Sequence, residues 1–390
     1  MYIKLKKAKE KAVLNFHPWI FSGAIHEVEK GIKSGDTVKV LSHEGQFLAY
    51  GHFDPSSQIR VRCFSYLENE SDETPEFWLK RWREIYKRKI DSFIDTENTG
   101  FRFLYSEGDM SPGFIVDCYD QSAVFFCRTP GSIRHKQTLV SLLIELGFNN
   151  ILEKESKNES DEVINAIFHK GHDKKVVFVE HGLRYYSDLE FGQKTGFFLD
   201  QRENRKLLGS YAKGKIVLNA FAYSGAFSVC ALKNKAEMVH SLDISSQAIA
   251  LTEENLDLNF DQSFIESKHK SIVKDCFVFL KEMKMDEYDL IILDPPAFTK
   301  NISTVNQAAR GYKEINMKAI SKIKKGGIIF TFSCSQHISS DLFRKIIFGA
   351  AKDTGRPVKV LHQMSQASDH AFSIYHPEGE YLKGLVIQVD

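Results

Sequence analysis

Five short apolar runs lie in the second half of the chain, and the stretches between them have the length and polarity of helices. The runs are 215–219, 238–243, 271–275, 289–294 and 328–334. Strands that alternate with helices form βαβ units around a parallel sheet. The alternation therefore predicts an α/β domain with a parallel-rich sheet, which we expect to cover residues 190–390.

Each run ends in a side chain that can contact a ligand. The end residues are Asn219, Asp243, Asp275, Asp294 and Cys334. In an open parallel sheet the ligand lies beyond the carboxyl ends of the strands, near the point where the strand order reverses. We therefore expect a Rossmann-like domain whose ligand site is built from these residues.

The first run continues into a short loop, residues 220–226, before a helix that should begin near Ala226. Gly225 lets the backbone approach a ligand, and Phe221 and Tyr223 stand beside it as further cofactor contacts. A nicotinamide enzyme would need G-x-G-x-x-G in this turn to hold the pyrophosphate. That fingerprint is absent from the loop, which argues against a nicotinamide oxidoreductase.

Two carboxylates are expected to contact a nucleoside cofactor. Asp243 can accept hydrogen bonds from both ribose hydroxyls, because Ser245 is available to cap the helix that follows. Asp275 can accept a hydrogen bond from the adenine amino group, or it can cap the helix 276–282. The sequence leaves both roles of Asp275 open.

The segment 294–298, with the sequence DPPAF, is the sharpest local signal in the chain. Two prolines after a buried strand fix an extended, rigid turn that has no backbone donors. Such a turn holds the Asp294 carboxylate and the neighbouring carbonyls toward the ligand edge of the sheet. Phe298 is expected either to stack on a substrate base or to pack in the core.

The first half of the chain has a different pattern. Short strands broken by turn residues predict a small β-barrel over residues 1–68, and the acidic stretch 68–75 predicts a linker. An α+β domain is expected over residues 76–186. Its first helix has an aromatic face and a basic face from Lys80 to Lys89, and a solvated outer face is the preferred interpretation over phosphate contacts.

Composition limits the partners and the compartment. The 390 residues carry 52 basic and 51 acidic side chains, so any RNA-binding surface must be local. No apolar run is long enough to span a bilayer, so no membrane contact is expected. The six cysteines have neither CxxC pairs nor zinc-ligand spacing, which predicts reduced thiols, no metal site and a cytoplasmic protein.

The motifs along nearly the whole chain resemble those of bacterial large-subunit ribosomal RNA cytosine-C5 methyltransferases that carry an N-terminal PUA domain. The resemblance rests on segments throughout the chain: 17–25, 107–117, 192–202, 310–316, 332–335 and 377–384. It implies a class I methyltransferase domain that uses S-adenosyl-L-methionine, preceded by a PUA RNA-binding domain. It also implies ribosomal RNA as the substrate and leaves the oligomeric state open, a homodimer included.

The same resemblance implies roles for particular residues. Gln201 and Arg202 belong to the segment that covers the methionine end of the cofactor, and Asp294 is shared between cofactor and substrate. Asn219 departs from the pattern, because relatives place an acidic residue there. An amide still accepts a hydrogen bond, so the departure puts this one contact in doubt.

Cytosine C5 is a poor nucleophile, so a C5 methyltransferase must first add a nucleophile at C6. A cysteine that ends an apolar strand is more often inert packing, but the resemblance implies that Cys334 is this nucleophile. Asp294 would hold the cytosine edge as the second catalytic residue. The base that removes the C5 proton stays unnamed, since His337 and His370 are better explained as structural or surface residues.

Two further functions fit parts of the pattern. Enzymes that methylate purine nitrogens in RNA also carry Asp-Pro-Pro turns, and they need no thiol. An RNA-binding protein that has lost catalysis would keep the fold, although Asp243, Asp294 and Cys334 argue against it. A cytosine-C5 methyltransferase and a purine N-methyltransferase both need a target base that lies in a loop or is flipped out of its helix.

Overall fold

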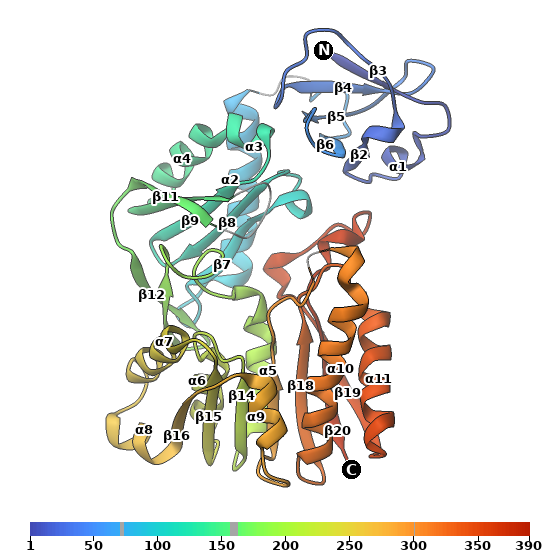
Figure 1. Ribbon diagram of the computed structural model, residues 1–390. Helices are drawn as coiled ribbons and strands as arrows, with labels where there is room; N and C mark the ends of the chain where they lie inside the picture. Colours follow the sequence, from blue (N-terminus) through green and yellow to red (C-terminus); the bar gives the residue numbers. More distant parts are fainter. Residues whose placement is uncertain (71–73, 157–162, 300) are drawn as a thin grey trace. The chain divides into compact units, whose positions relative to one another are not determined.

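The computed structural model describes residues 1–70, 74–156, 163–299 and 301–390 (Figure 1). The chain forms two compact units. Unit 1 contains Met1–Phe178, Ser187–Leu199 and Ser368–Gly379, and unit 2 contains Val179–Tyr186, Asp200–Ala367 and Glu380–Asp390. Residues 71–73 of the expected linker lie outside the described residues.

The amino-terminal part of unit 1 is a six-stranded sheet in the order β2-β6-β5-β4-β1-β3. Its strands are β1 (Tyr2–Leu5), β2 (Trp19–Phe21), β3 (Ile25–Val28), β4 (Thr37–Leu41), β5 (Phe47–Phe53) and β6 (Ile59–Ser65), with one short helix, α1 (Lys11–Leu14). Alternate residues of β4, such as Val38 and Val40, are fully buried, as expected for a strand with one face on a core. The expected amino-terminal β domain is confirmed.

Helix α2 (Pro75–Phe93) follows this sheet and buries its aromatic face. Thr74 caps it, and the rings of Trp78 and Trp82 stack with their centroids 5.2 Å apart. Part of the basic face also turns inward, because Arg81 donates to backbone carbonyls and Lys89 pairs with Asp109 at 2.8 Å. Other basic residues of the helix, among them Lys80 and Arg88, are exposed on its outer face.

The rest of unit 1 contains a five-stranded sheet in the order β11-β10-β9-β8-β7. Its elements are β7 (Gly100–Tyr105), β8 (Phe114–Tyr119), β9 (Ser122–Cys127), α3 (Pro130–Arg134), α4 (Lys136–Glu145), β10 (Asn150–Ser156) and β11 (Val163–Lys170). The strands β12 (Lys175–Glu180) and β13 (Leu183–Asp188), whose residues 179–186 belong to unit 2, pair with each other in a separate two-stranded sheet.

The segment Ser368–Gly379 belongs to unit 1, although it lies within the span expected for the methyltransferase domain. Its Asp369 carboxylate accepts a hydrogen bond from the backbone of Arg102 at 2.8 Å, and its Asp369 carbonyl accepts one from Lys89 at 2.9 Å. The Tyr105 hydroxyl donates to the carbonyl of Gly379 at 2.7 Å. These buried bonds tie the segment to β7 and α2.

Unit 2 is built on a seven-stranded sheet in the order β16-β15-β14-β17-β18-β20-β19. The strands are β14 (Ile216–Ala220), β15 (Met238–Asp243), β16 (His269–Val273), β17 (Leu290–Leu293), β18 (Gly327–Ser333), β19 (Val358–Ser365) and β20 (Lys383–Val389). The first five in this order are parallel, and β20 is antiparallel to both of its neighbours. The Rossmann-like sheet is confirmed, and its strand order reverses between β14 and β17.

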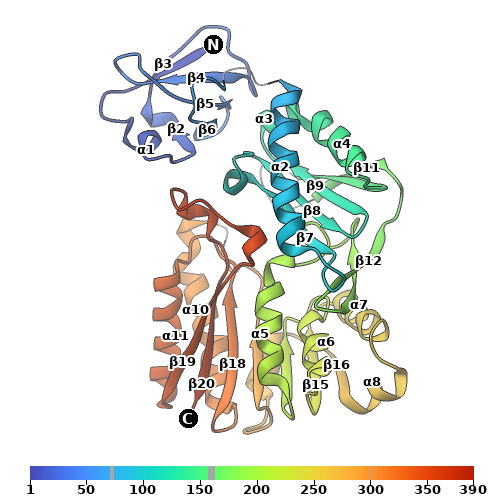
Figure 2. The same ribbon diagram turned by 180° about the vertical axis from the view of Figure 1, so that it is seen from behind.

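Helices cover both faces of this sheet, with α10 and α11 on one face and α5 on the other (Figures 1 and 2). The helices are α5 (Arg202–Ala212), α6 (Ala226–Lys233), α7 (Ser246–Asp257), α8 (Gln262–Lys268), α9 (Cys276–Glu282), α10 (Val305–Lys322) and α11 (Ser340–Thr354). One core cluster joins α9, α10 and α11 to the sheet, through residues such as Tyr312, Ile315 and Ile329. This packing fixes the strand ends that form the candidate site.

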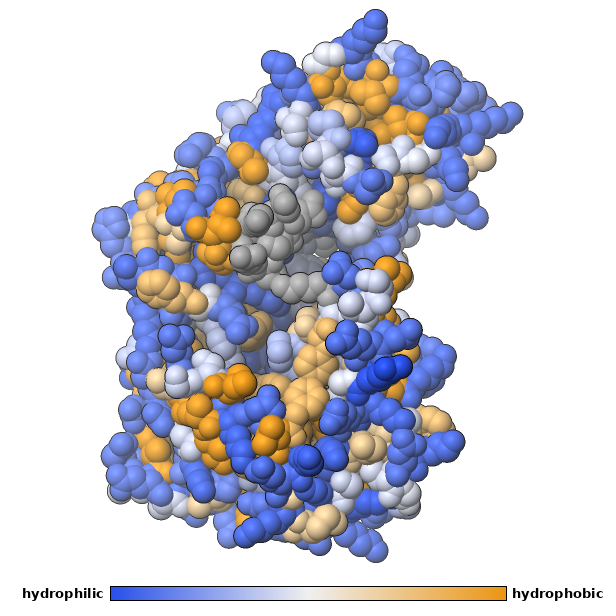
Figure 3. All heavy atoms as spheres, viewed as in Figure 1, coloured by the Kyte–Doolittle hydropathy of each residue, from blue (hydrophilic) through white to orange (hydrophobic). Residues whose placement is uncertain are grey.

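Hydrophilic side chains cover most of the viewed face of the molecule, and apolar ones occur in scattered groups (Figure 3). In the part of the chain that the structure describes, every helix is too short or too polar to cross a bilayer.

Candidate active site

The ends of β14, β15 and β17 lie level with one another at the point where the strand order reverses. Ala220 pairs with Leu242 on one side and with Leu293 on the other. Asp243 is the last residue of β15, and Phe221 and Asp294 directly follow β14 and β17, so the three residues lie side by side where the strands end. The row of strand ends expected from the sequence is thus one continuous edge, where ligands of such sheets bind.

The loop after β14 has an unusual backbone. Phe221, Tyr223 and Gly225 all adopt positive φ angles, of 63°, 48° and 69°. Non-glycine residues rarely adopt this conformation, and it persists only where the surroundings hold it, often at ligand sites. Here the Thr252 hydroxyl donates to the carbonyl of Tyr223 at 3.1 Å. A Cβ on Gly225 would lie 2.4 Å from the Thr252 side chain, so glycine is required there.

Asp243 is fixed by the loops on either side of it. One carboxylate oxygen accepts a hydrogen bond from the backbone N–H of Tyr223 at 3.0 Å, and the other accepts one from Ser245 at 2.9 Å. The Ser245 side chain caps α7, as expected, by accepting from Ala248. A carboxylate oxygen has two lone pairs, so each Asp243 oxygen can still accept a bond from a ligand hydroxyl.

Asp275 lies two residues beyond β16 and caps α9. Its side chain accepts a hydrogen bond from the backbone N–H of Val278 at 2.9 Å. The capping role that the sequence left open is therefore confirmed. The contact with adenine stays a prediction.

Asp294 and Gln201 contact each other directly. The Gln201 amide, which is only 3% exposed, donates to the Asp294 carboxylate at 3.0 Å. Asn204, one turn into α5, donates to the Gln201 side-chain oxygen at 2.7 Å and so orients the amide. Arg202 is equally buried beside them, with its guanidinium 3.2 Å from Glu203.

Cys334 follows β18 and lies next to the turn that begins at Asp294. Its sulfur is 3.8 Å from the carbonyl oxygen of Pro295, and its side chain is partly exposed. Other cysteines are placed differently, since burial raises the pKa of Cys63, Cys230 and Cys276 to about 12. Such thiols are inert at neutral pH. The structure thus brings Cys334 and Asp294, the two predicted catalytic residues, to the same edge.

Comparison with known proteins identifies the family. A PUA-like domain family matches residues 3–66, and an S-adenosylmethionine-dependent methyltransferase family matches residues 164–361. The chain is 36% identical over 392 residues to the ribosomal RNA large subunit methyltransferase I of Alteromonas mediterranea, covering 99% of this chain and 98% of that protein. It is 38% identical over 395 residues to the protein of the same name from Pseudoalteromonas atlantica, covering 99% of both. The chain belongs to this methyltransferase family.

Solved structures agree with the fold of the methyltransferase. A putative SAM-dependent methyltransferase from Streptococcus mutans superposes with a TM-score of 0.85 at 21% identity, and 100% of both chains is covered. A putative methyltransferase complexed with SAH gives a TM-score of 0.86 at 22% identity over the same coverage.

The residues at the strand ends fit S-adenosylmethionine, the cofactor of the methyltransferase. Asn219 donates to Ser228 at 2.9 Å, while its side-chain oxygen is buried and has no hydrogen-bond partner. A buried acceptor without a partner is costly unless a ligand supplies a donor, and the cofactor carries an ammonium group and hydroxyls. Asn219 therefore offers an acceptor to such a donor. Among the described residues no cluster of metal ligands is found.

Lys383 lies in the segment 377–384 that carries part of the family resemblance, but no role was predicted for it from the sequence. Lys383 begins β20 and is 4% exposed, and its ammonium donates to the carbonyl of Ser335 at 2.8 Å. The available signal was a lysine that opens an otherwise apolar strand. Tyr312 holds the same loop from α10, because its hydroxyl lies 2.9 Å from that of Ser335.

The structure also describes the surroundings of Phe298, His370 and His337. The Phe298 ring packs against Tyr312, with centroids 4.5 Å apart, and against Phe277 at 5.9 Å, which favours the core role. His370 is fully buried in unit 1 beside Asp369, and His337 is exposed. Neither histidine was expected to be catalytic, and that expectation stays a prediction.

Proposed function

We propose that this methyltransferase transfers a methyl group to C5 of a cytosine in large-subunit ribosomal RNA, with Cys334 as a covalent nucleophile. The observation that carries the proposal is the position of the Cys334 thiol, 3.8 Å from the Pro295 carbonyl at the cofactor edge of the sheet. An enzyme that methylates a purine nitrogen has no use for a thiol there. The relatives that span the whole chain are named for large-subunit ribosomal RNA, which supports the substrate.

The chemistry follows from the electronic structure of cytosine. The Cys334 thiolate adds to C6, and the resulting enamine makes C5 nucleophilic. Bound S-adenosylmethionine supplies the methyl group that C5 accepts. Asp294 is expected to hold the N3 or amino edge of the base and to stabilise the charge that develops during attack at C6. The Gln201 amide keeps the Asp294 carboxylate in place for this task.

The cofactor is proposed to lie across the level strand ends. Asp243 would accept from the ribose hydroxyls, Asp275 from the adenine amino group, and Asn219 from a cofactor donor. The loop residues Phe221, Tyr223 and Gly225 would approach the cofactor through their backbone, and Gln201 and Arg202 would contact its methionine end. The fixed carboxylate of Asp243 and the orphaned oxygen of Asn219 support this arrangement.

The RNA is expected to be held through its backbone, with little sequence readout, by the PUA-like domain and by exposed basic residues such as Lys80 and Arg88 on α2. The target cytosine must leave any helix to reach Cys334. Because its substrate is ribosomal RNA, we place the enzyme in the cytoplasm.

Bisulfite mapping of large-subunit ribosomal RNA tests the proposal. RNA from cells that lack the gene should lose one 5-methylcytosine, and the wild-type gene should restore it. The C334A variant should not restore it, whereas C127A, which removes a thiol in unit 1, should. Full methylation by C334A would contradict covalent catalysis, and a lost mark on a purine instead of a cytosine would favour purine N-methylation.

A further inference from the structure

Lys383 stands beside the candidate nucleophile without an assigned role. It is the first residue of β20, and it pairs across the sheet with Ser333, the residue before Cys334. Its side chain is 4% exposed. A lysine is seldom so deeply buried, because removing its charge from water is costly. Neighbouring groups must therefore stabilise the buried Lys383 side chain.

The Lys383 amine is held by two backbone carbonyls. It donates to Ser335, the residue after Cys334, at 2.8 Å and to Tyr381 at 2.7 Å. A neutral amine has two N–H groups and one lone pair, so these two carbonyls use both of its donors. The lone pair remains for a proton. The two bonds also fix the amine against the Ser333–Ser335 loop that carries the thiol.

Burial brings the pKa of this amine close to the working pH, so that a neutral fraction is available to accept a proton. Burial lowers the pKa of Lys383 to about 8, while the nearby charges of Cys334 and Glu380 act in the opposite direction. Tyr312 is the other titratable group at this loop, and burial raises the pKa of its phenol, so it stays protonated. A general base works best when its pKa lies near the working pH.

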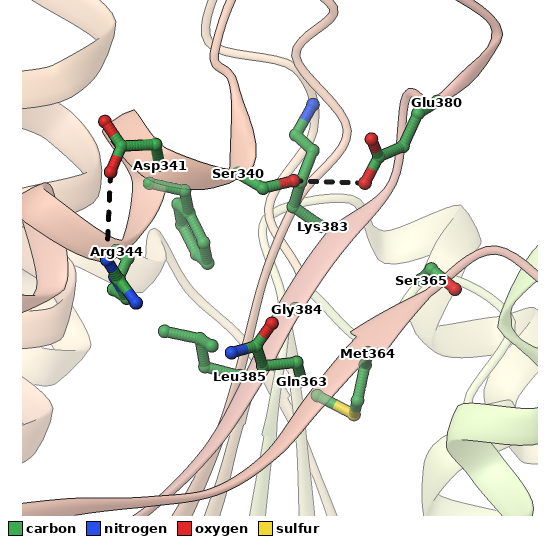
Figure 4. Close-up of a pocket in the computed structure, with 11 residues that line it drawn as sticks. Ser340, Asp341, Arg344, Gln363, Met364, Ser365, Glu380, Lys383, Gly384 and Leu385 are labelled. Atoms are coloured by element: carbon green, nitrogen blue, oxygen red, sulfur yellow. Dashed lines mark hydrogen bonds and ion pairs between the residues drawn. The ribbon is translucent and has the colours of Figure 1, made fainter. Parts of the chain in front are cut away.

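Lys383 also borders a pocket. Lys383 lines a pocket of about 450 Å³ together with Ser340, Glu380 and residues of β19 and α11. Lys383, Ser340 and Glu380 lie at one end of this pocket, where the Ser340 hydroxyl donates to Glu380 at 3.0 Å (Figure 4).

We infer that Lys383 is the base that removes the C5 proton from the methylated Cys334 adduct, an inference that rests on the proposed cytosine-C5 function. The lone pair of Lys383 takes the proton from C5, and the C5–H electrons form the C5–C6 double bond. The C6–S bond breaks, and its electron pair leaves with Cys334 as thiolate. The products are 5-methylcytosine, a thiolate and a lysine ammonium, which then releases its proton to water. The new ammonium and the new thiolate stabilise each other, because they are adjacent opposite charges.

Two variants of Lys383 test its role in removing the C5 proton. Without the base, the covalent protein–RNA intermediate should accumulate. K383M removes the base, and K383R keeps a positive charge and hydrogen-bond donors but cannot accept a proton near neutral pH. In both, incubation with cofactor and RNA should leave a protein–RNA adduct that survives denaturing electrophoresis and contains the transferred methyl group. Turnover should fall by about 100-fold or more. The exposed K345M on α11 is the matched control and should turn over without an adduct.

A lysine that only holds the loop makes a different prediction. K383R would then keep most of its turnover, and no adduct would accumulate in either variant, which would overturn the inference. Calorimetry of cofactor binding reports whether each variant is folded. Should neither variant fold, the wild-type enzyme decides the matter. Its rate of adduct breakdown should rise with pH and level off near pH 8, the pKa of Lys383, and a rate independent of pH there would contradict the role.

The same experiment separates this inference from the proposed function. The double variant C334A/K383M should form no adduct, because the bond to C6 requires the thiol. An active C334A enzyme would remove the proposed function itself. An inactive C334A enzyme together with a fully active K383M enzyme would keep the proposed function and reject Lys383 as the base.

Discussion

The side-chain amide of Gln201 donates a hydrogen bond to the Asp294 carboxylate at 3.0 Å. This bond joins the residue before α5 to the end of β17, and Asn204 fixes the orientation of the amide from one turn further on. Because Gln201 is buried, the bond is shielded from water and holds the carboxylate in one direction. A carboxylate that must meet one edge of a base benefits from such a restraint.

Replacing Gln201 with alanine should therefore weaken catalysis more than folding. A hydrogen bond to a charged group contributes about 1.5–3 kcal/mol, so we expect kcat/KM for RNA to fall roughly 10- to 100-fold. The measurement is methyl transfer to ribosomal RNA, with the melting temperature as the control. An unchanged kcat/KM would mean that Asp294 needs no help from Gln201.

The loop after β14 provides a second test, with a matched control in the same unit. Gly225 and Gly214 both have a φ of 69°, but only at Gly225 would an added Cβ meet another atom within 4 Å. G225A should therefore weaken cofactor binding, because the loop must shift away from Thr252, whereas G214A should show only the cost of backbone strain, about 1 kcal/mol. Titration calorimetry of S-adenosylmethionine compares them, and equal affinities would argue against a tightly fitted loop.

Asp275 allows its two roles to be separated. Asparagine caps helices about as well as aspartate, so D275N should leave the melting temperature unchanged. Its side-chain oxygen would stay on Val278, and its NH2 group would then face the adenine amino group, donor against donor. We therefore expect weaker cofactor binding, and an unaltered Kd would identify Asp275 as a helix cap alone.

The stability of the enzyme should decrease in mild acid because of His269 on β16. Burial lowers its pKa from 6.5 to about 4 in the folded chain, and His240 adds to the effect. Below pH 6.5 the unfolded chain therefore binds a proton that the folded chain does not. The contribution of the uncharged His269 to the free energy of unfolding is fully present above pH 6.5 and is lost progressively as the pH falls toward 4.

Thermal unfolding across this pH range checks the role of His269. The wild-type melting temperature should fall more steeply with acid than that of H269Q, which cannot titrate at this position. Parallel curves for the two proteins would show that another group causes the acid sensitivity.

The sequence predicted the sheet of unit 2 because its strands are local apolar runs, each readable without knowledge of the rest of the chain. The meeting of the strand ends at one edge could also be predicted, because parallel strands run in the same direction and end at the same edge of the sheet. The sequence left two roles for Asp275 because strand β16 ends at Val273 and a helix begins directly after Asp275. Strand boundaries of this kind depend on capping, which short-range patterns leave open.

Other features depend on contacts between distant parts of the chain. The position of Lys383 beside the candidate nucleophile could not be predicted from the sequence. It follows from the antiparallel pairing of β20 with β18, which brings residue 383 beside residue 333. The inward positions of Arg81 and Lys89 likewise depend on partners in other elements, among them Asp109. A basic stretch in a helix is the same pattern whether its side chains face water or a buried carboxylate.

Fluorinated RNA can trap the proposed covalent bond between Cys334 and cytosine C6. Fluorine at C5 cannot be removed as a proton, so large-subunit ribosomal RNA transcribed with 5-fluorocytidine should trap the methylated adduct. Mass spectrometry of the digested complex should find one nucleotide attached to the peptide that contains Cys334. An enzyme that methylates ordinary RNA yet leaves this peptide unmodified by the fluorinated RNA would show that Cys334 is not the nucleophile.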